Sequence, residues 1–185
     1  MMPELSLNVL DVAQNSVRAE ASLIKISVLA DTSKDTLTIQ IQDDGCGMTA
    51  EQAAHVEDPF FTTRTTRKVG LGVPFFKLAA ESTGGSFSID TAPGTGTTVT
   101  AVFGLSHIDR MPLGDMTSTI HTLITMNEQI DFLYLYQVDE RSFTLDTREF
   151  RQILGDVSFQ EPEISAYIKD YLSENERETR QDAAI

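Results

Sequence analysis

The sequence contains no tryptophan, one cysteine, three histidines and no long run of apolar residues. A single cysteine, Cys46, excludes an intrachain disulfide and is typical of a reducing compartment. No apolar stretch approaches the roughly 20 residues of a membrane-spanning helix. Residues 1–4 also lack the basic and then apolar order of a signal peptide. These features predict a cytoplasmic protein that does not insert into a membrane.

Basic residues are also scarce, with 14 Lys and Arg against 28 Asp and Glu, for a formal net charge of -14. Residues 1–104 carry 7 basic and 12 acidic side chains, and residues 105–185 carry 7 and 16. Such a surface repels nucleic acid and anionic membranes, so neither is expected as a partner. The 185 residues, 41% of them hydrophobic, are enough for one full domain and an appendage.

The most informative strand pattern lies in residues 37–43. Its odd positions are apolar up to Asp43, which therefore inherits the inward direction of the strand's buried face. An unpaired buried carboxylate would cost several kcal/mol, so either the fold or a ligand must supply donors. Gly45 and Gly47 follow, and they allow a sharp bend and the close approach of a flat ligand. A base with an exocyclic amine would satisfy Asp43.

A helix predicted from Pro3 to about Arg18 carries an ordered polar stripe beside its apolar face. The stripe consists of Asn8, Asp11, Asn15 and Arg18, at spacings of three, four and three residues. Asp11, Asn15 and Arg18 offer a proton acceptor, an Mg²⁺ ligand and a phosphate contact, respectively. A solvated helix face would show the same spacing, so both interpretations stay open at this point.

A second candidate site lies in residues 59–72, which are too polar for a core strand and too rich in threonine for a stable helix. Three cations, Arg64, Arg67 and Lys68, fall within five residues, and a Gly-Leu-Gly sequence runs into a helix predicted over 73–82. A glycine turn at a helix N-terminus favours an anion such as phosphate. A purely structural turn is the alternative.

The predicted elements through residue 104 are a helix, two strands, a short helix, a loop, a helix and two strands. The strands cover 23–30, 36–42, 86–90 and 97–103, and the short helix begins with a capping box at Thr49 and Gln52. Helices on one face of an antiparallel sheet predict an α/β fold, a two-layer α/β sandwich.

Four short motifs occur in order between residues 5 and 104: 11–16 (DVAQNS), 43–48 (DDGCGM), 70–73 (GLGV) and 94–97 (GTGT). Together they resemble the asparagine and glycine boxes of the histidine-kinase-like ATPase (GHKL, Bergerat fold) superfamily. That superfamily groups gyrase, the ninety-kilodalton heat-shock chaperone, sensor histidine kinases and MutL, with the anti-sigma-factor kinases nearby. Residues 59–64 (PFFTTR) are similar to the segment that precedes the lid in sensor kinases.

The resemblance implies a role for each matching residue. Asp43 would accept a hydrogen bond from the adenine amino group, Asn15 would hold Mg²⁺, and Asp11 would be the general base for hydrolysis. Met48 would pack on the base and Thr97 would share a water with Asp43. The implied ATP-binding residues are Asn15, Arg18, Asp43, Gly45, Gly47, Met48, Arg64, Arg67, Lys68, Gly70, Leu71, Gly72, Val73 and Thr97.

Some positions depart from the family pattern. Asp11 stands where hydrolysing relatives carry glutamate, which is one methylene longer. Arg18 matches the basic residue of sensor kinases, whereas MutL relatives carry an acid there. The second glycine box lacks its usual leading glycine, and Lys68 stands near that position.

The remaining residues fall outside the resemblance. Residues 105–172 are expected to form a small α/β extension, with helices from 115 to 126, from 146 to 155 and around 164–172 and a strand over 131–138. Residues 173–185 are expected to be a charged, disordered tail. Residues 105–113 are similar to the phosphoacceptor box of sensor kinases, which makes His107 a possible phosphoacceptor. A chance match in a strand-to-helix connection is the alternative.

Two classes of function follow from the resemblance. The first is an Mg-ATP-dependent enzyme that hydrolyses ATP or transfers phosphate to a protein partner. The second is a non-catalytic, ATP-gated interaction module similar to an anti-sigma regulator, in which bound ATP orders a surface that a protein partner reads. The sequence does not identify the partner or the oligomeric state.

Overall fold

The computed structural model describes residues 3–58 and 72–185. All six strands form one sheet in the order β3-β4-β2-β1-β5-β6. The elements are α1 (Leu5–Arg18), β1 (Leu23–Asp31), β2 (Thr36–Asp43), α2 (Ala50–His55), α3 (Gly72–Glu81), β3 (Ser86–Ala92), β4 (Gly96–Gly104), α4 (Met116–Met126), β5 (Asp131–Val138), β6 (Arg141–Asp146), α5 (Thr147–Leu154) and α6 (Pro162–Arg180).

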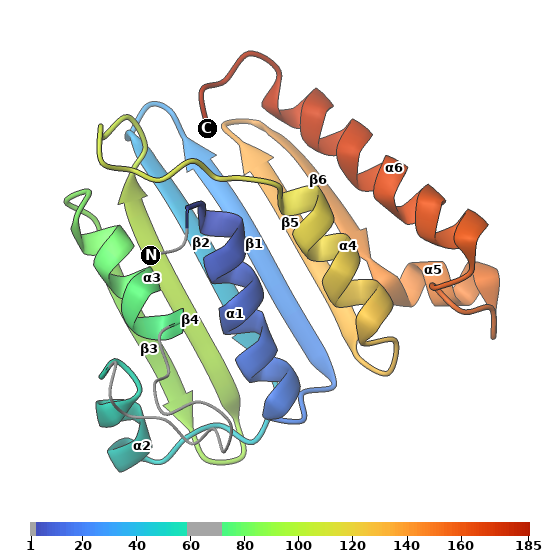
Figure 1. Cartoon of the computed structure of the whole chain (residues 1–185), viewed down its shortest axis with the longest axis horizontal. Helices are drawn as coiled ribbons and strands as arrows, with labels where there is room; N and C mark the ends of the chain where they lie inside the picture. The colour runs from blue at the N-terminus through green and yellow to red at the C-terminus, as the bar shows by residue number, and fades with distance from the viewer. Residues whose placement is uncertain (1–2, 59–71) are drawn as a thin grey trace.

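Helices α1, α3, α4 and α6 lie across one face of this sheet, so the predicted two-layer α/β sandwich is confirmed (Figure 1). The strands show the reason, because every second residue of β1, and of β2 as far as Ile41, is an apolar side chain buried beneath the helices. Ile24, Ile26 and Val28 of β1 belong to this core. Asp43 continues the buried face of β2, as the alternation predicted.

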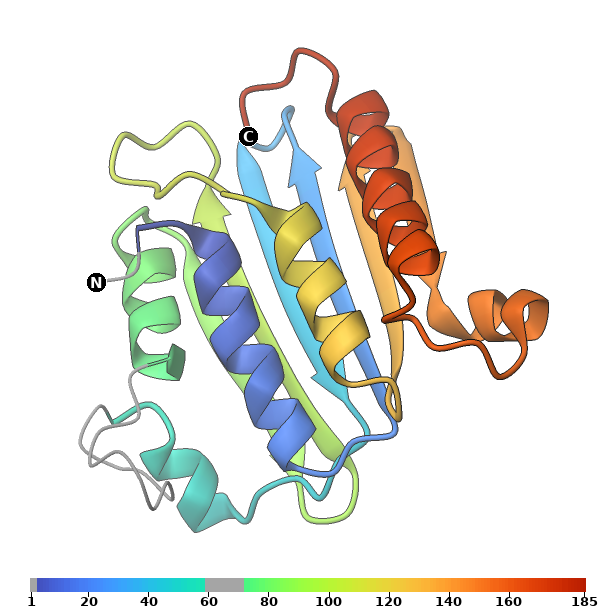
Figure 2. The same cartoon turned by 45° about the vertical axis from the view of Figure 1, so that its right-hand side comes forward.

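The C-terminal elements extend the same sheet. Strand β5 lies beside β1 and parallel to it, whereas the other four strand pairs are antiparallel. A parallel neighbour requires a crossover connection, and α4 provides it by packing next to α1 (Figure 2). The sequence pattern did not predict β6, whose short stretch places Phe143 and Leu145 in the core.

The prediction that residues 173–185 form a disordered tail is wrong for most of that segment, because α6 continues to Arg180. Charged residues dominate this part of the sequence, yet Thr179 and Ile185 are buried. The Arg180 guanidinium donates hydrogen bonds to the carbonyl oxygens of Ala183 and Ile185, at 3.2 and 2.7 Å. The charges lie on the outer face of an amphipathic helix, and composition alone does not separate this case from disorder.

One partly buried carboxyl group ties α6 to its neighbours. The hydroxyl groups of Thr117 on α4 and Tyr134 on β5 donate to the Glu176 carboxylate at 3.0 and 3.1 Å. Burial raises the pKa of Glu176 to about 7; these hydrogen bonds and Arg180 act in the opposite direction, while Asp115 adds to the rise.

We therefore expect a specific pH dependence of stability. A pKa raised by folding means that the folded state binds more protons, so the contribution of Glu176 is greatest below about pH 4.5 and is lost as the pH rises to about 7. Glu176→Gln should remove a dependence of about 2–3 kcal/mol over this range and be the more stable protein at pH 8. Urea unfolding at pH 5 and pH 8 measures it, and the exposed Glu178→Gln is the matched control. Equal pH slopes for Glu176→Gln and the wild type would contradict this assignment.

Candidate functional site

Asp43 lies at the end of β2 with 8% of its surface exposed. The Ser16 hydroxyl donates to its Oδ2 at 2.5 Å. The backbone N–H groups of Gly45 and Thr97 donate to its Oδ1 at 2.9 and 3.2 Å. The fold therefore supplies three donors to this carboxylate, from α1, from the bend after β2 and from β4. This arrangement offsets much of the cost of burying the charge.

The glycine bend after Asp43 packs against the turn between β3 and β4. Gly47 has a φ of +66°, and a Cβ there would lie 1.9 Å from the Ala92 carbonyl oxygen. Gly96 has a φ of +90°, and its Cβ would lie 1.9 Å from the Asp43 carbonyl oxygen. Side chains at these two positions would push the glycine bend and the β3–β4 turn apart, so glycine is required at both for the two segments to pack this closely.

A cavity of about 340 Å³ opens beside Asp43, between α1, the glycine bend, α2 and the start of α3. This volume falls within the range of small-molecule sites. Its walls are mainly apolar, with polar groups at a few points, as is usual for ligand sites. The lining residues are Val12, Asn15, Ser16, Arg18, Ala19, Asp43, Cys46, Gly47, Met48, Gln52, Val56, Gly72, Val73, Ile89, Thr97 and Val99.

The structure brings most of the described candidate residues together at this cavity. The described candidates in its wall are Asn15, Arg18, Asp43, Gly47, Met48, Gly72, Val73 and Thr97. Gly45 lies behind the wall, where a Cβ would meet the Ala19 carbonyl oxygen at 2.7 Å. The other predicted ATP-binding residues, Arg64, Arg67, Lys68, Gly70 and Leu71, lie outside the described residues.

Asp11, the predicted base, lies against the start of α3. A Cβ on Gly72 would fall 1.9 Å from Asp11 Oδ2. Asp11 is not among the described residues that line the cavity. Its carboxylate therefore meets the first residue of a helix whose N-terminus favours negative charge, next to the cavity wall formed by Gly72 and Val73.

The polar stripe of α1 is partly paired within itself. The Arg18 guanidinium donates to Asn15 Oδ1 at 2.5 Å, one helical turn away. An amide oxygen is a suitable Mg²⁺ ligand, but a bound cation would have to share this oxygen with Arg18 or displace it. In the described residues, no group of three or more His, Cys, Asp or Glu side chains could hold a metal by itself. Among the described residues that line the cavity, Asn15 is thus a side chain that can offer one oxygen ligand to a cation.

Sequence reasoning missed Ser16 as a site residue. It follows Asn15 in the asparagine box, and on the helix it faces the sheet, where its hydroxyl meets Asp43. The inward direction of position 16 was readable from the helical period. Its partner was not, because 27 residues separate Ser16 from Asp43.

His107 lies away from the cavity. It follows the end of β4, whereas Thr97 stands at the start of the same strand. Strands rise about 3.3 Å per residue, so Thr97 and Gly104 are about 23 Å apart. The Asp109 N–H donates to His107 Nδ1 at 3.1 Å. The structure therefore places His107 beyond the opposite end of β4 from the cavity residue Thr97.

Among the described residues, none of the helices has the length and apolar character that a bilayer crossing requires.

Comparisons with known proteins agree with the geometry. Residues 3–107 match the family model described as histidine kinase-, DNA gyrase B-, and HSP90-like ATPase. A probable C4-dicarboxylate sensor kinase of Bacillus subtilis is 31% identical over 88 residues, which cover 48% of this chain and 16% of that protein. The C4-dicarboxylate transport sensor protein DctB of Pseudomonas aeruginosa is 32% identical over 79 residues, which cover 42% of this chain and 13% of that protein.

The similarity to these sensor proteins is confined to part of each one, since this chain spans 16% and 13% of their lengths. The crystal structure of the N-terminal domain of a DNA repair protein is similar to this chain with a TM-score of 0.54. The match covers 78% of this chain and 52% of the chain in that crystal structure. At 16% identity this likeness shows the fold. The family match covers more than half of the chain and confirms the resemblance seen in the four motifs. The chain therefore belongs to the histidine kinase-, DNA gyrase B- and HSP90-like ATPase family.

Proposed function

We propose that this protein binds Mg-ATP in the cavity beside Asp43 and transfers the terminal phosphoryl group to water or to a protein partner. The observation that carries the proposal is the hydrogen bonding of Asp43. A carboxylate offers about four acceptor positions, and the fold fills three of them. The position left over, at the wall of a largely apolar cavity, suits a flat base that donates one hydrogen bond.

The rest of the cavity suits a nucleotide in the same orientation. Met48 and the apolar side chains of the wall would pack on the base, and Thr97 would hold a water beside Asp43. Gly72 and Val73, in the cavity wall at the first turn of α3, would direct free N–H groups at the phosphates.

Mg²⁺, held by Asn15 and the phosphates, would neutralise charge that develops during phosphoryl transfer. Arg18 would move from the Asn15 oxygen to a phosphate oxygen, for which a guanidinium is well suited. Asp11, in contact with Gly72, would accept the proton of the attacking water or hydroxyl group.

The position of Asp11 also favours a second candidate function. Because its carboxylate packs on the start of α3, it could serve mainly to fix that helix end. The protein would then be an ATP-gated interaction module, in which the nucleotide orders a surface for a protein partner. Both candidates require ATP binding, and they differ in turnover.

Cys46 provides a direct test of binding, since it is the single cysteine of the chain and lies exposed in the cavity wall. Saturating Mg-ATP should slow its alkylation by iodoacetamide at least about tenfold, because the bound base removes the thiol from solvent and reagent. Mass spectrometry of the intact protein over time measures the rate. Mg-GTP is the control nucleotide, since guanine presents a carbonyl oxygen to Asp43 where adenine presents an amine, and it should protect less. An alkylation rate unchanged by ATP would overturn the binding site.

A further inference from the structure

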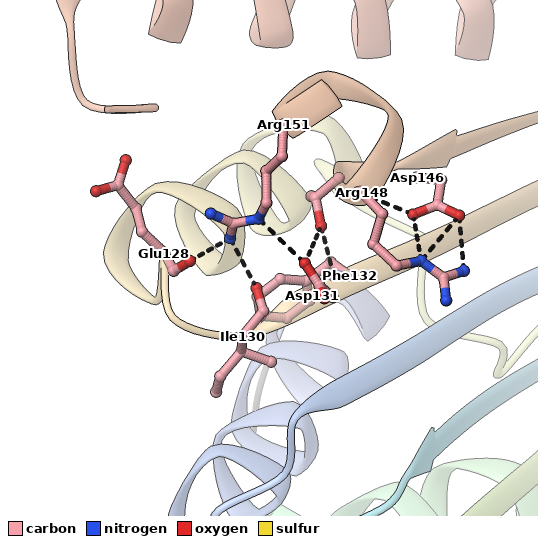
Figure 3. Close-up of polar contacts among 8 residues, drawn as sticks. Glu128, Ile130, Asp131, Phe132, Asp146, Arg148 and Arg151 are labelled. Carbon is pink, nitrogen blue, oxygen red and sulfur yellow. Dashed lines mark hydrogen bonds and ion pairs between the residues drawn. The ribbon is translucent and has the colours of Figure 1, made fainter. Parts of the chain in front are cut away.

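Helix α5 is held at the end of the sheet by its polar side chains. Arg151 donates from Nε to Asp131 Oδ1 at 3.1 Å, and its Nη2 contacts the carbonyl oxygens of Glu128 and Ile130 (Figure 3). The Thr147 hydroxyl accepts from the Phe132 N–H at 2.8 Å. An isolated helix of eight residues would not be stable in water, so these contacts fix α5 in place.

Because polar groups anchor α5, part of its apolar side faces solvent. Ile153 is 81% exposed, and Phe150, three residues earlier, lies on the same side of the helix. The Phe150 ring meets two rings of α6 edge to face, Tyr167 at 6.2 Å and Tyr171 at 5.7 Å between centroids. Tyr167 is itself 57% exposed. The rings of Phe150, Tyr167 and Tyr171 meet across α5 and α6, and Ile153 follows Phe150 by one turn on α5. We name these four side chains the α5–α6 patch.

Acidic side chains border the α5–α6 patch. Glu163, Asp170 and Glu174 are exposed on α6 within one or two turns of Tyr167. Glu149 lies beside Tyr171. Burial is the main cause that raises the pKa of the Tyr171 phenol, and the charges of Tyr167 and Glu149 raise it further.

Of the cations near this border, Arg148 and Lys169 act on other carboxylates, whereas Arg177 stands one turn from Glu174. Arg148 is paired with Asp146 at 2.7 Å (Figure 3). Lys169 lies on the side of α6 where its charge acts on Asp115.

We propose that the α5–α6 patch is the docking surface for a partner protein segment with an apolar face flanked by lysine or arginine. The patch presents aromatic rings at fixed positions, which is typical of interface anchors, and its acidic border selects basic flanks. A second copy of this chain would bring an equally acidic border and a net charge of -14 against it, and nucleic acid or an anionic membrane would be repelled.

The test uses a fluorescein-labelled 14-residue peptide of leucine and lysine, with leucine on one helical face, and a second peptide with glutamate in place of each lysine. Fluorescence anisotropy with the whole chain should show saturable binding of the lysine peptide and none of the glutamate peptide. The double substitution Ile153→Ser with Tyr167→Ser should weaken binding at least about tenfold, which is about 1.4 kcal/mol. Ile153→Ser alone, at a highly exposed position, should keep the fold and weaken binding about threefold or more.

Leu78→Ser is the matched control, because Leu78 of α3 is exposed by the same 57% as Tyr167, and it should bind the peptide as the wild type does. Equal affinity for the wild type and the double variant would overturn the proposal, since binding would then reflect the acidic surface as a whole. Failure of the wild type to bind the lysine peptide would also overturn it. Sedimentation velocity measures the oligomeric state. A wild-type dimer that becomes a monomer in the Ile153→Ser variant would overturn the proposal and assign the patch to a second copy of this chain.

Discussion

Replacing Asp43 by asparagine is expected to weaken ATP binding by about two orders of magnitude, or about 3 kcal/mol. The side-chain carbonyl oxygen of asparagine can still accept from the N–H groups of Gly45 and Thr97. Its NH2 group would then face the adenine amine, and two donors cannot bond to each other, although the Ser16 hydroxyl could still accept from this NH2 group. Isothermal titration calorimetry with Mg-ATP measures the loss.

The chain offers a matched control for this substitution. Asp90 is an exposed aspartate on β3, between Ile89, which lines the cavity, and Thr91. Successive side chains of a strand point to opposite faces, so Asp90 points away from the cavity. Asp90→Asn makes the same chemical change and should leave the ATP affinity unchanged. Wild-type affinity in Asp43→Asn would remove Asp43 from the site and with it the basis of the proposed function.

Ser16→Ala tests how much the orientation of the Asp43 carboxylate, rather than its charge, contributes to ATP binding. This variant keeps the Asp43 charge but removes the donor to its Oδ2. We expect an intermediate loss of ATP affinity, about fivefold to tenfold, because the hydroxyl only positions the acceptor.

Asp11→Asn is expected to lower the rate of ATP turnover by at least about 100-fold, the usual contribution of a general base. ATP affinity should change less than about threefold, since Asp11 is not among the described residues lining the cavity. Steady-state phosphate release measures turnover, and calorimetry of the same preparations measures binding. Loss of the carboxylate beside the α3 N-terminus should also lower stability by about 0.3–1 kcal/mol, a change that thermal unfolding detects.

The two candidate functions predict different outcomes for this pair of measurements. Asp11→Glu keeps a carboxylate and should retain turnover, which separates the loss of a base from a disturbance of Gly72. Unchanged phosphate release in Asp11→Asn would contradict the base assignment. A wild-type protein that binds Mg-ATP tightly and releases no phosphate would favour the interaction module.

The sequence was sufficient wherever the decisive pattern is local. Strand alternation predicted that Asp43 points into the core, and the structure confirms this direction. The capping box at Thr49 and Gln52 is present with both of its hydrogen bonds. These features depend on residues two to four positions apart, where backbone periodicity determines which side chains share a face.

The errors arose where a short segment owes its structure to distant contacts. Residues 141–146 form β6 because β5 lies beside them. Helix α6 continues past Ser173 because Leu172 and Thr179 are buried and the Glu176 carboxylate accepts hydrogen bonds from α4 and β5. A charged composition predicts disorder only when the segment has no apolar stripe that can pack against the rest of the protein.

The sequence by itself determined the family, the order of the main elements through residue 104 and the inward direction of the Asp43 carboxylate. The tertiary structure decided which groups meet: Ser16 with Asp43, Asp11 with Gly72, and β5 with β1. The physical reason is that periodicity sets the direction of a side chain, whereas its partner depends on how elements far apart in the chain pack. That packing is set by the shape and burial of the whole core.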